Sequence, residues 1–402
     1  MTGRIAVAAA WAVIAAAPLP AQESIFGHLG FGVPEEGLSV RSRGMGNVTT
    51  ALPRIHFTFR NPAALSAFDR TGISIGALLQ TRTPEDELAE SRQNSVEVPF
   101  LQLAFPLVGG LVLGGGYYRY LDFDGFVDTS TTFGGDTLPV RLETDGGISV
   151  LSPQLAMRFS RLLRVGAGLD FYTGSRERRR RIEFDPDVAV PTADSTEHGF
   201  RSLGVSAGVH VEPVPGLLLG GAWRSGTSLE GELDVDDDED DGGAPRPEIE
   251  VKLPPSWSVG ASYRFGPRMT VAAEAEFASW SDFAVEGVRD PEGEDTSAFG
   301  AGVEVMLPRR ILLLPEDATL RAGARTRTLP RRFGGAEVRE RAVSVGFGHV
   351  VGIGASALDL ALEVGRRGSV SDNGIAEGFL RLGVSLAGFE QWASRGPGDR
   401  RP

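Results

Sequence analysis

The acidic run at residues 230–250 contains the densest group of side chains that could bind a metal ion. Four carboxylates and a glycine have EF-hand spacing over twelve positions: Asp237, Glu239, Asp241, Gly242 and Glu248. Oxygen atoms spaced in this way can surround a hard cation such as calcium. Prolines follow at 245 and 247, and no flanking helices are expected, so a solvated loop without metal is favoured. We expect no cofactor.

The same run carries most of the formal net charge of −13. A second charged run, Arg-Glu-Arg-Arg-Arg-Arg at residues 176–181, has the opposite sign. Guanidinium groups bind phosphates in pairs of hydrogen bonds, so this run is a candidate contact for lipopolysaccharide and other outer-membrane lipids. The alternative is compositional, because Lys252 is the only lysine and arginine is the general cation of this chain. The acidic balance gives no support to a nucleic-acid partner.

No arrangement of residues typical of an enzyme is present in the sequence. The five histidines are scattered, and neither a metal-protease motif nor a serine-hydrolase motif occurs: His28, His56, His198, His210 and His349. We therefore expect a protein that is not an enzyme.

Several short segments alternate between apolar and polar residues with a period of two, and this alternation puts their charged side chains on one face. In residues 269–277, Met269, Val271 and the alternate positions after them are apolar, while Glu274 and Glu276 fall on the other face. The same period recurs around Leu163, Leu358 and Leu380. Such strands face two different solvents, as the strands of a membrane barrel do. The charges on their polar faces are expected to form ion pairs inside the barrel.

About fourteen such segments follow one another between residues 71 and 392. Their connections alternate between long and short, and the long ones include residues 122–146, 174–198 and 226–253. Outer-membrane barrels have short periplasmic turns and long outer loops, which this alternation matches. The predicted fold class is an all-β, transmembrane antiparallel β-barrel of about 14 strands in the outer membrane of a Gram-negative-type bacterium.

The two ends of the chain are predicted not to form part of the barrel wall. Residues 1–21 combine Arg4, a short apolar run and small residues, as a secretory signal peptide does. Residues 22–70 are rich in glycine and proline, and a barrel of fourteen strands is wide enough to leak unless something blocks it. We therefore interpret residues 22–70 as a hatch inside the lumen, and residues 393–402 as a short tail.

Several motifs then resemble one known family. The segment Phe-Arg-Asn-Pro-Ala-Ala-Leu contains Asn61, Pro62 and Ala63, which resemble the triplet in the hatch of the FadL-type (OmpP1/TodX-like) outer-membrane transport family. Residues 41–47, Arg-Ser-Arg-Gly-Met-Gly-Asn, are similar to the glycine-rich segment before that triplet. Residues 253–283 and the end of the chain resemble a central strand pair and the last hairpin of the family.

The resemblance implies a monomeric channel for passive uptake of hydrophobic compounds such as long-chain fatty acids. The compounds would leave through a lateral opening gated by the hatch. The resemblance implies that Asn61, Pro62 and Ala63 are gate residues. The alternative is a simple turn that ends the hatch. By the same resemblance, the candidate ligand contacts are Phe26, Leu29 and Phe31.

Two other functions stay open. Some barrels of this type act as accessory factors in protein export or as interaction partners, and these would have a sealed lumen. A nonspecific porin would instead need an aqueous path past the hatch. The transporter hypothesis predicts a lateral gap in the wall beside the hatch.

Overall fold

The computed structural model describes residues 24–28, 32–35, 38–86, 92–133, 136–182, 192–235, 248–285, 287–310, 314–351 and 356–390. The predicted signal peptide and C-terminal tail lie outside these ranges. So do Leu29, Phe31, Asp237, Glu239 and Asp241, while Glu248 begins a strand whose first side chains are not described. Among the described residues, no helix is long and apolar enough to cross a membrane.

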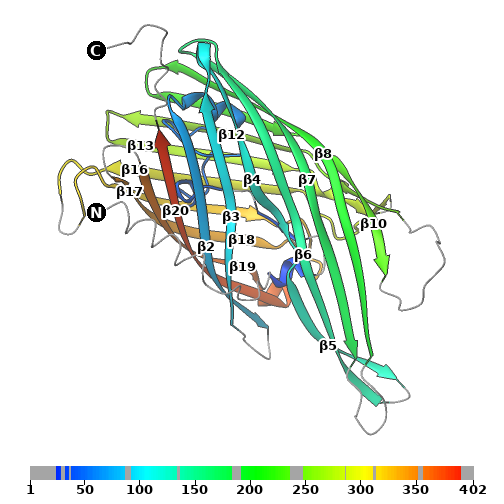
Figure 1. Cartoon of the computed structure of the whole chain (residues 1–402). Coiled ribbons are helices and arrows are strands. Elements are labelled where there is room, and N and C mark those ends of the chain that lie inside the picture. Colours follow the sequence, from blue (N-terminus) through cyan, green and yellow to red (C-terminus); the bar gives the residue numbers. More distant parts are fainter. Residues whose placement is uncertain are drawn as a thin grey trace, which may run out of the picture.

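Fourteen of the described strands close into one antiparallel barrel, as the sequence predicts (Figure 1). In order around the wall, they are β2 (Thr71–Asp86), β3 (Gln93–Pro106), β4 (Leu111–Asp122), β6 (Asp136–Arg158), β7 (Leu163–Ile182), β8 (Thr192–Val214), β9 (Leu217–Arg224), β12 (Ser256–Phe265), β13 (Met269–Ala278), β16 (Thr296–Met306), β17 (Thr319–Thr328), β18 (Arg339–Val351), β19 (Ser356–Ser369) and β20 (Ile375–Glu390). The barrel closes where β2 pairs with β20, from Thr71↔Glu390 to Asp86↔Ile375. Closure pairs the first strand of the wall with the last, so neither of these two strands is left as a free sheet edge.

The two faces of the wall follow the period of two. On β9 and β12, Leu219, Trp257 and Val259 point outward and are exposed, whereas Leu218, Ser258 and Ser262 point inward and are buried. Trp223 and Trp257 pack against each other on the outside, with ring centroids 5.8 Å apart. Aromatic side chains at this level are typical of the edge of the apolar band of a membrane barrel.

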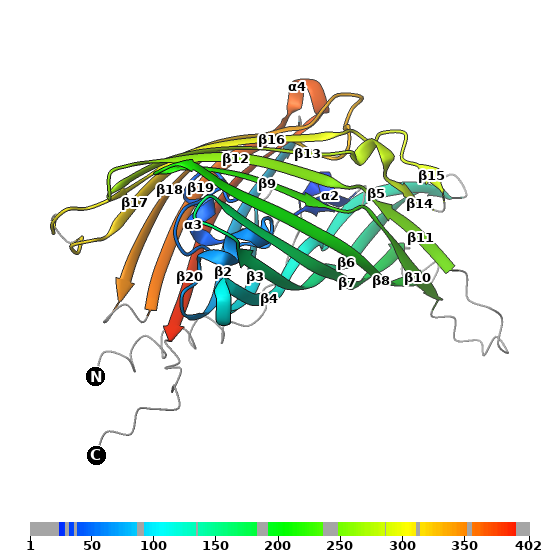
Figure 2. The ribbon, with the colours of Figure 1, turned by 90° about the horizontal axis from the view of Figure 1, so that it is seen from above.

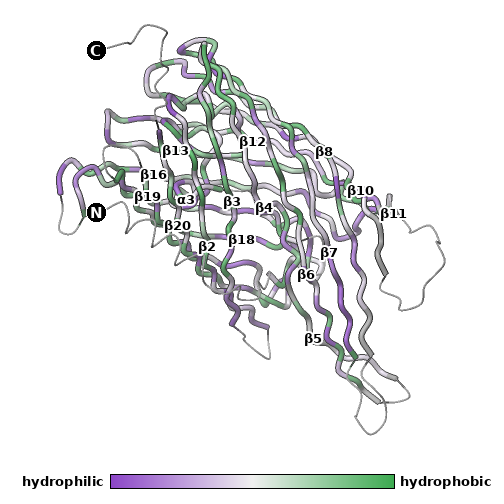
Figure 3. Tube along the Cα trace, viewed as in Figure 1, coloured by the Kyte–Doolittle hydropathy of each residue, from purple (hydrophilic) through white to green (hydrophobic). Residues whose placement is uncertain are grey.

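The outer connections contain more strand than the sequence predicts. They hold β5 (Gly125–Phe133), β10 (Thr227–Val235), β11 (Glu248–Leu253), η3 (Trp280–Asp282), β14 (Ala284–Val285), β15 (Val288–Arg289) and α4 (Val370–Asn373). The arginine run, expected in a loop, is instead the outer part of β7, paired with β6 and β8. Figure 1 shows β5 to β8 extending well beyond the other strands, and Figure 3 shows hydrophilic colours along that extension. This extension is exposed to water on both faces, so both faces are polar and the alternation between apolar and polar residues is lost.

Most of the periplasmic connections are short; the longest, residues 307–318, joins β16 to β17. The β3–β4 turn is η2 (Val108–Gly110), and the β8–β9 and β12–β13 turns contain Gly216 and Gly266, both with positive φ. Tight turns of this kind favour glycine because it adopts positive φ without strain.

The segment before β2 lies inside the ring of strands, where Figure 2 shows its blue helices. It contains α2 (Ile25–His28), β1 (Val33–Pro34), α3 (Val40–Arg43) and η1 (Pro62–Ala67), and we call residues 24–70 the N-terminal segment. Its close contact with the wall explains the glycine-rich motif. Gly46 has φ +69, and a Cβ atom there would lie 2.5 Å from the carbonyl oxygen of Ala324. Opposite it, a Cβ on Gly323 would lie 2.1 Å from the Gly46 nitrogen.

Candidate functional site

The wall is interrupted in its hydrogen bonding between β3 and β4. Their ladder runs from the periplasmic end only as far as Phe100↔Tyr118. Beyond that level, β3 continues toward Gln93 paired with β2, and β4 continues toward Asp122 paired with β6. Within the described part of the chain, no pairing joins β3 to β4 in this outer half. One edge of β4 is therefore freed at this place.

The N-terminal segment occupies this edge of β4. In β1, Val33 pairs with Asp122 and Pro34 pairs with Leu121. The next amide, of Glu35, donates a hydrogen bond of 2.7 Å to the carbonyl oxygen of Tyr120. Tyr120 itself stands at an irregularity in the β4–β6 register. A short piece of the N-terminal segment thus takes the place on β4 that β3 leaves.

Ion pairs hold this piece against the wall. The carboxylate of Glu35 contacts Arg43 at 3.2 Å and Arg381 of β20 at 3.5 Å. Burial alone would raise the pKa of Glu35, but the guanidinium groups of Arg381 and Arg43 outweigh it and lower the pKa to about 2. Glu35 is therefore charged at every physiological pH.

Apolar side chains fill the outer half of the lumen beside this interruption. They come from β3, β4 and the strands that follow, together with Phe59 of the N-terminal segment: Phe59, Phe100, Tyr118, Leu121, Phe123, Ile148, Val150, Tyr172, Phe200, Leu229, Val251, Leu253, Trp280 and Phe283. The rings of Phe59 and Tyr118 lie 4.7 Å apart at the level where β3 and β4 separate. We call this set the outer-lumen cluster.

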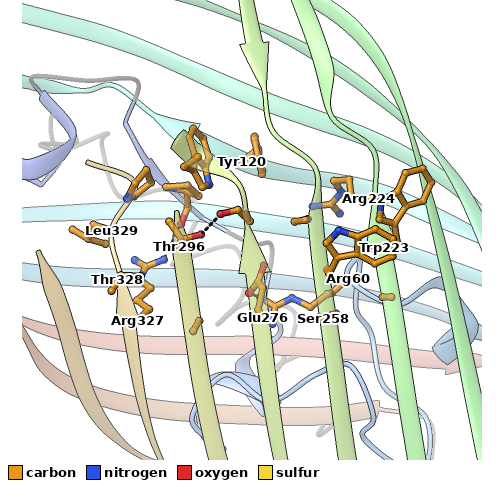
Figure 4. A pocket seen from close by; sticks show the side chains of 18 residues that line it. Arg60, Tyr120, Trp223, Arg224, Ser258, Glu276, Thr296, Arg327, Thr328 and Leu329 are labelled. Atoms are coloured by element: carbon orange, nitrogen blue, oxygen red, sulfur yellow. Dashed lines mark hydrogen bonds and ion pairs between the residues drawn. The ribbon is translucent and has the colours of Figure 1, made fainter. Parts of the chain in front are cut away.

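A cavity lies between the outer-lumen cluster and the strands β9, β12, β13 and β16 (Figure 4). Pro34, Tyr120, Trp280 and Leu329 contribute apolar wall. At about 50 Å³ the cavity holds only a few waters. A drug-sized or lipid-sized molecule needs several hundred Å³, so its entry would require side chains to move.

Three arginines reach the same cavity. Arg60 contacts Glu276 at 2.9 Å, Arg224 contacts Asp170 at 3.1 Å, and Arg327 donates a hydrogen bond of 3.0 Å to the carbonyl oxygen of Pro34. In Figure 4, Arg60 and Glu276 lie side by side, with Tyr120 and Leu329 on one side of the cavity and Arg224 on the other. The cavity therefore combines apolar wall with guanidinium groups, which is the chemistry that binds an amphiphile with an acidic head.

Deeper in the lumen, the predicted ion pairs are confirmed. Arg41 of α3 binds both carboxylate oxygens of Glu304, and Arg321 binds the same carboxylate at 2.8 Å. Glu274 accepts the backbone amides of Thr49 and Thr50 at 2.6 and 2.5 Å. These contacts attach the N-terminal segment to β13, β16 and β17.

A second network centres on Glu340 of β18, which is fully buried. Its carboxylate is surrounded by Arg325, Arg327 and Arg367. Because Arg327 also binds the Pro34 carbonyl, this network reaches β1.

The predicted gate triplet lies against another part of the wall. The Asn61 side chain accepts from the amide of Ala63 and donates to the carbonyl oxygens of Thr50 and Val209. Asn61 caps η1, which packs chiefly on β6, β7 and β8. The triplet thus ends the N-terminal segment with a capped turn, away from the β3–β4 interruption. Its role as a gate stays a prediction.

Of the three predicted ligand contacts, Phe26 alone is described. It is buried with Val33 and Leu329, and its ring meets Phe333 edge to face at 5.4 Å. Phe26 therefore supports β1 from behind rather than facing the cavity. Its role as a ligand contact is also still a prediction.

His56 gives the N-terminal segment a pH dependence. Its Nε2 lies 2.7 Å from the Thr49 hydroxyl, and burial, with a contribution from Arg41, lowers its pKa well below 6.5. When the pH falls below 6.5, a released segment binds a proton that the docked segment does not, so docking weakens by up to about 1.4 kcal/mol per pH unit. The protection factors of residues 40–60, which are hydrogen-exchange rates corrected for the intrinsic pH dependence of exchange, should therefore be lower at pH 5 than at pH 7.5. The difference should shrink in His56→Gln and persist in the control His349→Gln; an equal difference in both variants would contradict this assignment.

A closed fourteen-strand barrel with an apolar outer surface and an internally bound N-terminal segment defines a class: an outer-membrane β-barrel. The chain matches the BamG family over residues 1–214 and 225–396, and it belongs to that family. It is an outer-membrane protein.

Solved structures share the fold. A FadL homologue from Pseudomonas aeruginosa is 13% identical, with TM-score 0.60, and the match covers 90% of this chain and 99% of that one. The toluene transporter TodX of Pseudomonas putida is 17% identical, with TM-score 0.59 and coverage of 90% and 99%. The monoaromatic hydrocarbon channel CymD is 17% identical, with TM-score 0.54 and coverage of 90% and 98%. None of the curated proteins searched matches the chain.

Proposed function

We propose that this barrel takes up hydrophobic compounds from outside the cell, with residues 22–70 acting as the hatch. The observation that carries the proposal is the separation of β3 from β4 beside the outer-lumen cluster, with β1 on the freed edge of β4. A compound that enters the outer-lumen cluster is one strand away from the lipid. Because its transfer into lipid avoids water, such a path costs little free energy.

In this mechanism the structure is the closed state. Removal of β1 from β4 would leave unpaired backbone groups of β4 facing the space between β3 and β4. A hydrophobic compound could then pass sideways into the membrane. In this proposal, residues 33–35 form the gate. Asn61, Pro62 and Ala63 stay fixed to the wall while the part of the segment before them moves.

We propose an amphiphile with an acidic head, such as a long-chain fatty acid, as the preferred substrate. Arg224 and Arg327 line the cavity beside Tyr120 and Leu329, so a carboxylate would find guanidinium donors while its chain lies on apolar wall. A neutral aromatic compound would use the apolar wall alone, and we expect it to be taken up more slowly.

The proposal is tested by filling the cavity. Ala222 is 8% exposed, points inward on β9 and lines the cavity, so Ala222→Trp should block it. In cells that lack their own uptake channels, this variant should lower the uptake of radiolabelled oleate about tenfold relative to the unmodified protein, a loss of about 1.4 kcal/mol. The matched control is Leu219→Trp, which adds the same ring to the outer face of the same strand. Equal uptake by the two variants would contradict the proposal.

A second function is favoured by a separate observation. The strands β5 to β8 and β10 extend beyond the membrane band as a hydrogen-bonded sheet, which could serve as a binding surface for another protein. In an export-accessory role, the outer-membrane protein content of a deletion strain would fall, and Ala222→Trp would restore it fully. A porin would instead conduct ions steadily in planar bilayers; the ion pairs that fill the lumen argue against such conduction.

Contacts with lipopolysaccharide remain part of the proposal for the outer part of β7. Arg179 is paired with Asp145 and Glu177, at 3.1 and 2.6 Å. Arg178 and Arg180 line a hollow of about 470 Å³ with residues of β5, β6 and β8. Phosphate groups of neighbouring lipids could bind there.

A further inference from the structure

A second cavity, of about 220 Å³, lies at the periplasmic end of the barrel. Pro53 and Ala67 of the N-terminal segment form one side, and Gly216 of the β8–β9 turn forms another. Four arginines and one glutamate supply all of its charge: Arg54, Arg158, Arg164, Glu212 and Arg264. The cavity is thus lined by an excess of positive charge, and none of it belongs to the uptake site.

The single carboxylate cannot neutralise these arginines. Glu212 binds Arg164 at 3.2 Å and also accepts the amide of Gly216 at 3.3 Å. Arg54 and Arg158 each donate to one backbone carbonyl oxygen, those of Pro267 and Ser66, at 2.5 and 2.7 Å. Those neutral contacts leave most of their N–H groups available.

Arg264 stands out among the four. Within the part of the chain that the structure describes, no ion pair or hydrogen bond holds its guanidinium group. It projects from the inner face of β12 near its periplasmic end, where the wall turns back at Gly266. Arg264 is only partly buried, so its N–H groups can be reached from the periplasm, and a bound anion would give them a partner.

The backbone also positions a charge here at some cost. Arg54 has φ +67, a left-handed conformation that is strained for a residue with a side chain. Burial lowers the pKa of Arg54; the carboxylate of Glu304 partly offsets this, and the guanidinium groups of Arg41 and Arg264 lower the pKa further. The fold therefore brings these like charges together although they repel one another.

We propose that this periplasmic cavity binds the carboxylate or phosphate groups of an anionic ligand that approaches from the periplasm. Guanidinium groups suit both groups because they donate paired N–H bonds to two oxygen atoms. The volume accepts one or two such groups, so the ligand is either a small multivalent anion or an acidic peptide segment that inserts its side chains. This binding would not depend on uptake through the outer-lumen cluster.

The test uses the full chain in neutral detergent micelles. A fluorescein-labelled hexaglutamate peptide is the probe, its anisotropy is the readout, and a hexaglutamine peptide is the uncharged control. We expect salt-sensitive binding of hexaglutamate only. The double variant Arg54→Gln with Arg264→Gln should bind it at least about tenfold more weakly, because two charge-assisted contacts are lost. Arg264→Gln alone is the second variant, since it removes no internal contact and should fold normally.

The matched control is Arg268→Gln, an exposed arginine on the same turn that does not line the cavity. It should change the affinity less than about twofold. Inorganic pyrophosphate identifies the source: displacement of the peptide at micromolar pyrophosphate indicates a free anion, and displacement only at millimolar concentration indicates an acidic segment. Equal binding by Arg264→Gln and Arg268→Gln, or no binding of hexaglutamate at low salt, would overturn the proposal.

Discussion

A disulfide between β1 and β4 is expected to stop uptake, and reduction is expected to restore it. The variant carries Pro34→Cys and Leu121→Cys, which are register partners, in a chain that has no other cysteine. The Glu35 amide bonds to the Tyr120 carbonyl, so the adjacent pair 34/121 is of the non-hydrogen-bonded type. Such pairs have Cα atoms about 4.5 Å apart, within the range that a disulfide spans.

The physical reason is that a covalent bond prevents the separation of β1 from β4 that the proposed gate requires. If β1 must leave β4 for a compound to pass, oxidised cells should take up oleate at about background rate, at least tenfold below reduced cells. The controls are the two single-cysteine variants under the same oxidant. A further control is a disulfide within the wall, between Ser74→Cys of β2 and Ala387→Cys of β20. Normal uptake with the 34–121 bond formed would place the gate elsewhere, with Asn61, Pro62 and Ala63 as the next residues to examine.

The wall could be predicted because each membrane strand meets two solvents. In β13, Val271 is exposed to the lipid side and Glu274 is buried on the lumen side, so the pattern appears directly in the sequence. The strands of the outer extension could not be predicted in this way. Arg178 and Arg180 share one face of β7, and Glu177 and Arg179 share the other, so both faces are polar.

The position of β1 on the edge of β4 was beyond prediction for a different reason. β1 is two residues long and includes Pro34, which has no N–H to donate, so its sequence carries no strand signal. What places it is tertiary contact, through Glu35 with Arg43 and Arg381. The periplasmic cavity was not predicted, although the charges on the polar strand faces were expected to lie inside the barrel. Alternation along a strand predicts which face of the wall a side chain lies on. Which side chains of the neighbouring strands it contacts depends on the stagger between the strands, which the alternation does not give.

Loss of the Glu340 carboxylate is expected to destabilise the barrel more than any other single change discussed above. Glu340 is fully buried between three guanidinium groups, and Arg367, one of them, is only 1% exposed. Glu340→Gln keeps the shape of the side chain but leaves the buried positive charges without their shared counter-ion. Breaking a buried ion pair from one side costs about 3–5 kcal/mol. The remaining ion pairs offset part of this cost, because Arg367 and Arg325 keep Glu377 and Glu363 as partners, at 3.0 and 3.1 Å.

Arg327 has no such second carboxylate among its described ion pairs, and it holds the Pro34 carbonyl of β1. Glu340→Gln should therefore loosen β1, the proposed gate, before the wall unfolds. Two measurements separate the effects: the temperature at which the barrel loses its compact mobility on denaturing gels, and hydrogen exchange of residues 33–35 below that temperature. Glu337→Gln, an exposed carboxylate that pairs with Arg339 on the same hairpin, is the matched control and should change neither. If Glu340→Gln lowered the unfolding temperature and left exchange at residues 33–35 unchanged, the network would stabilise the wall alone, and the gate would depend on Glu35.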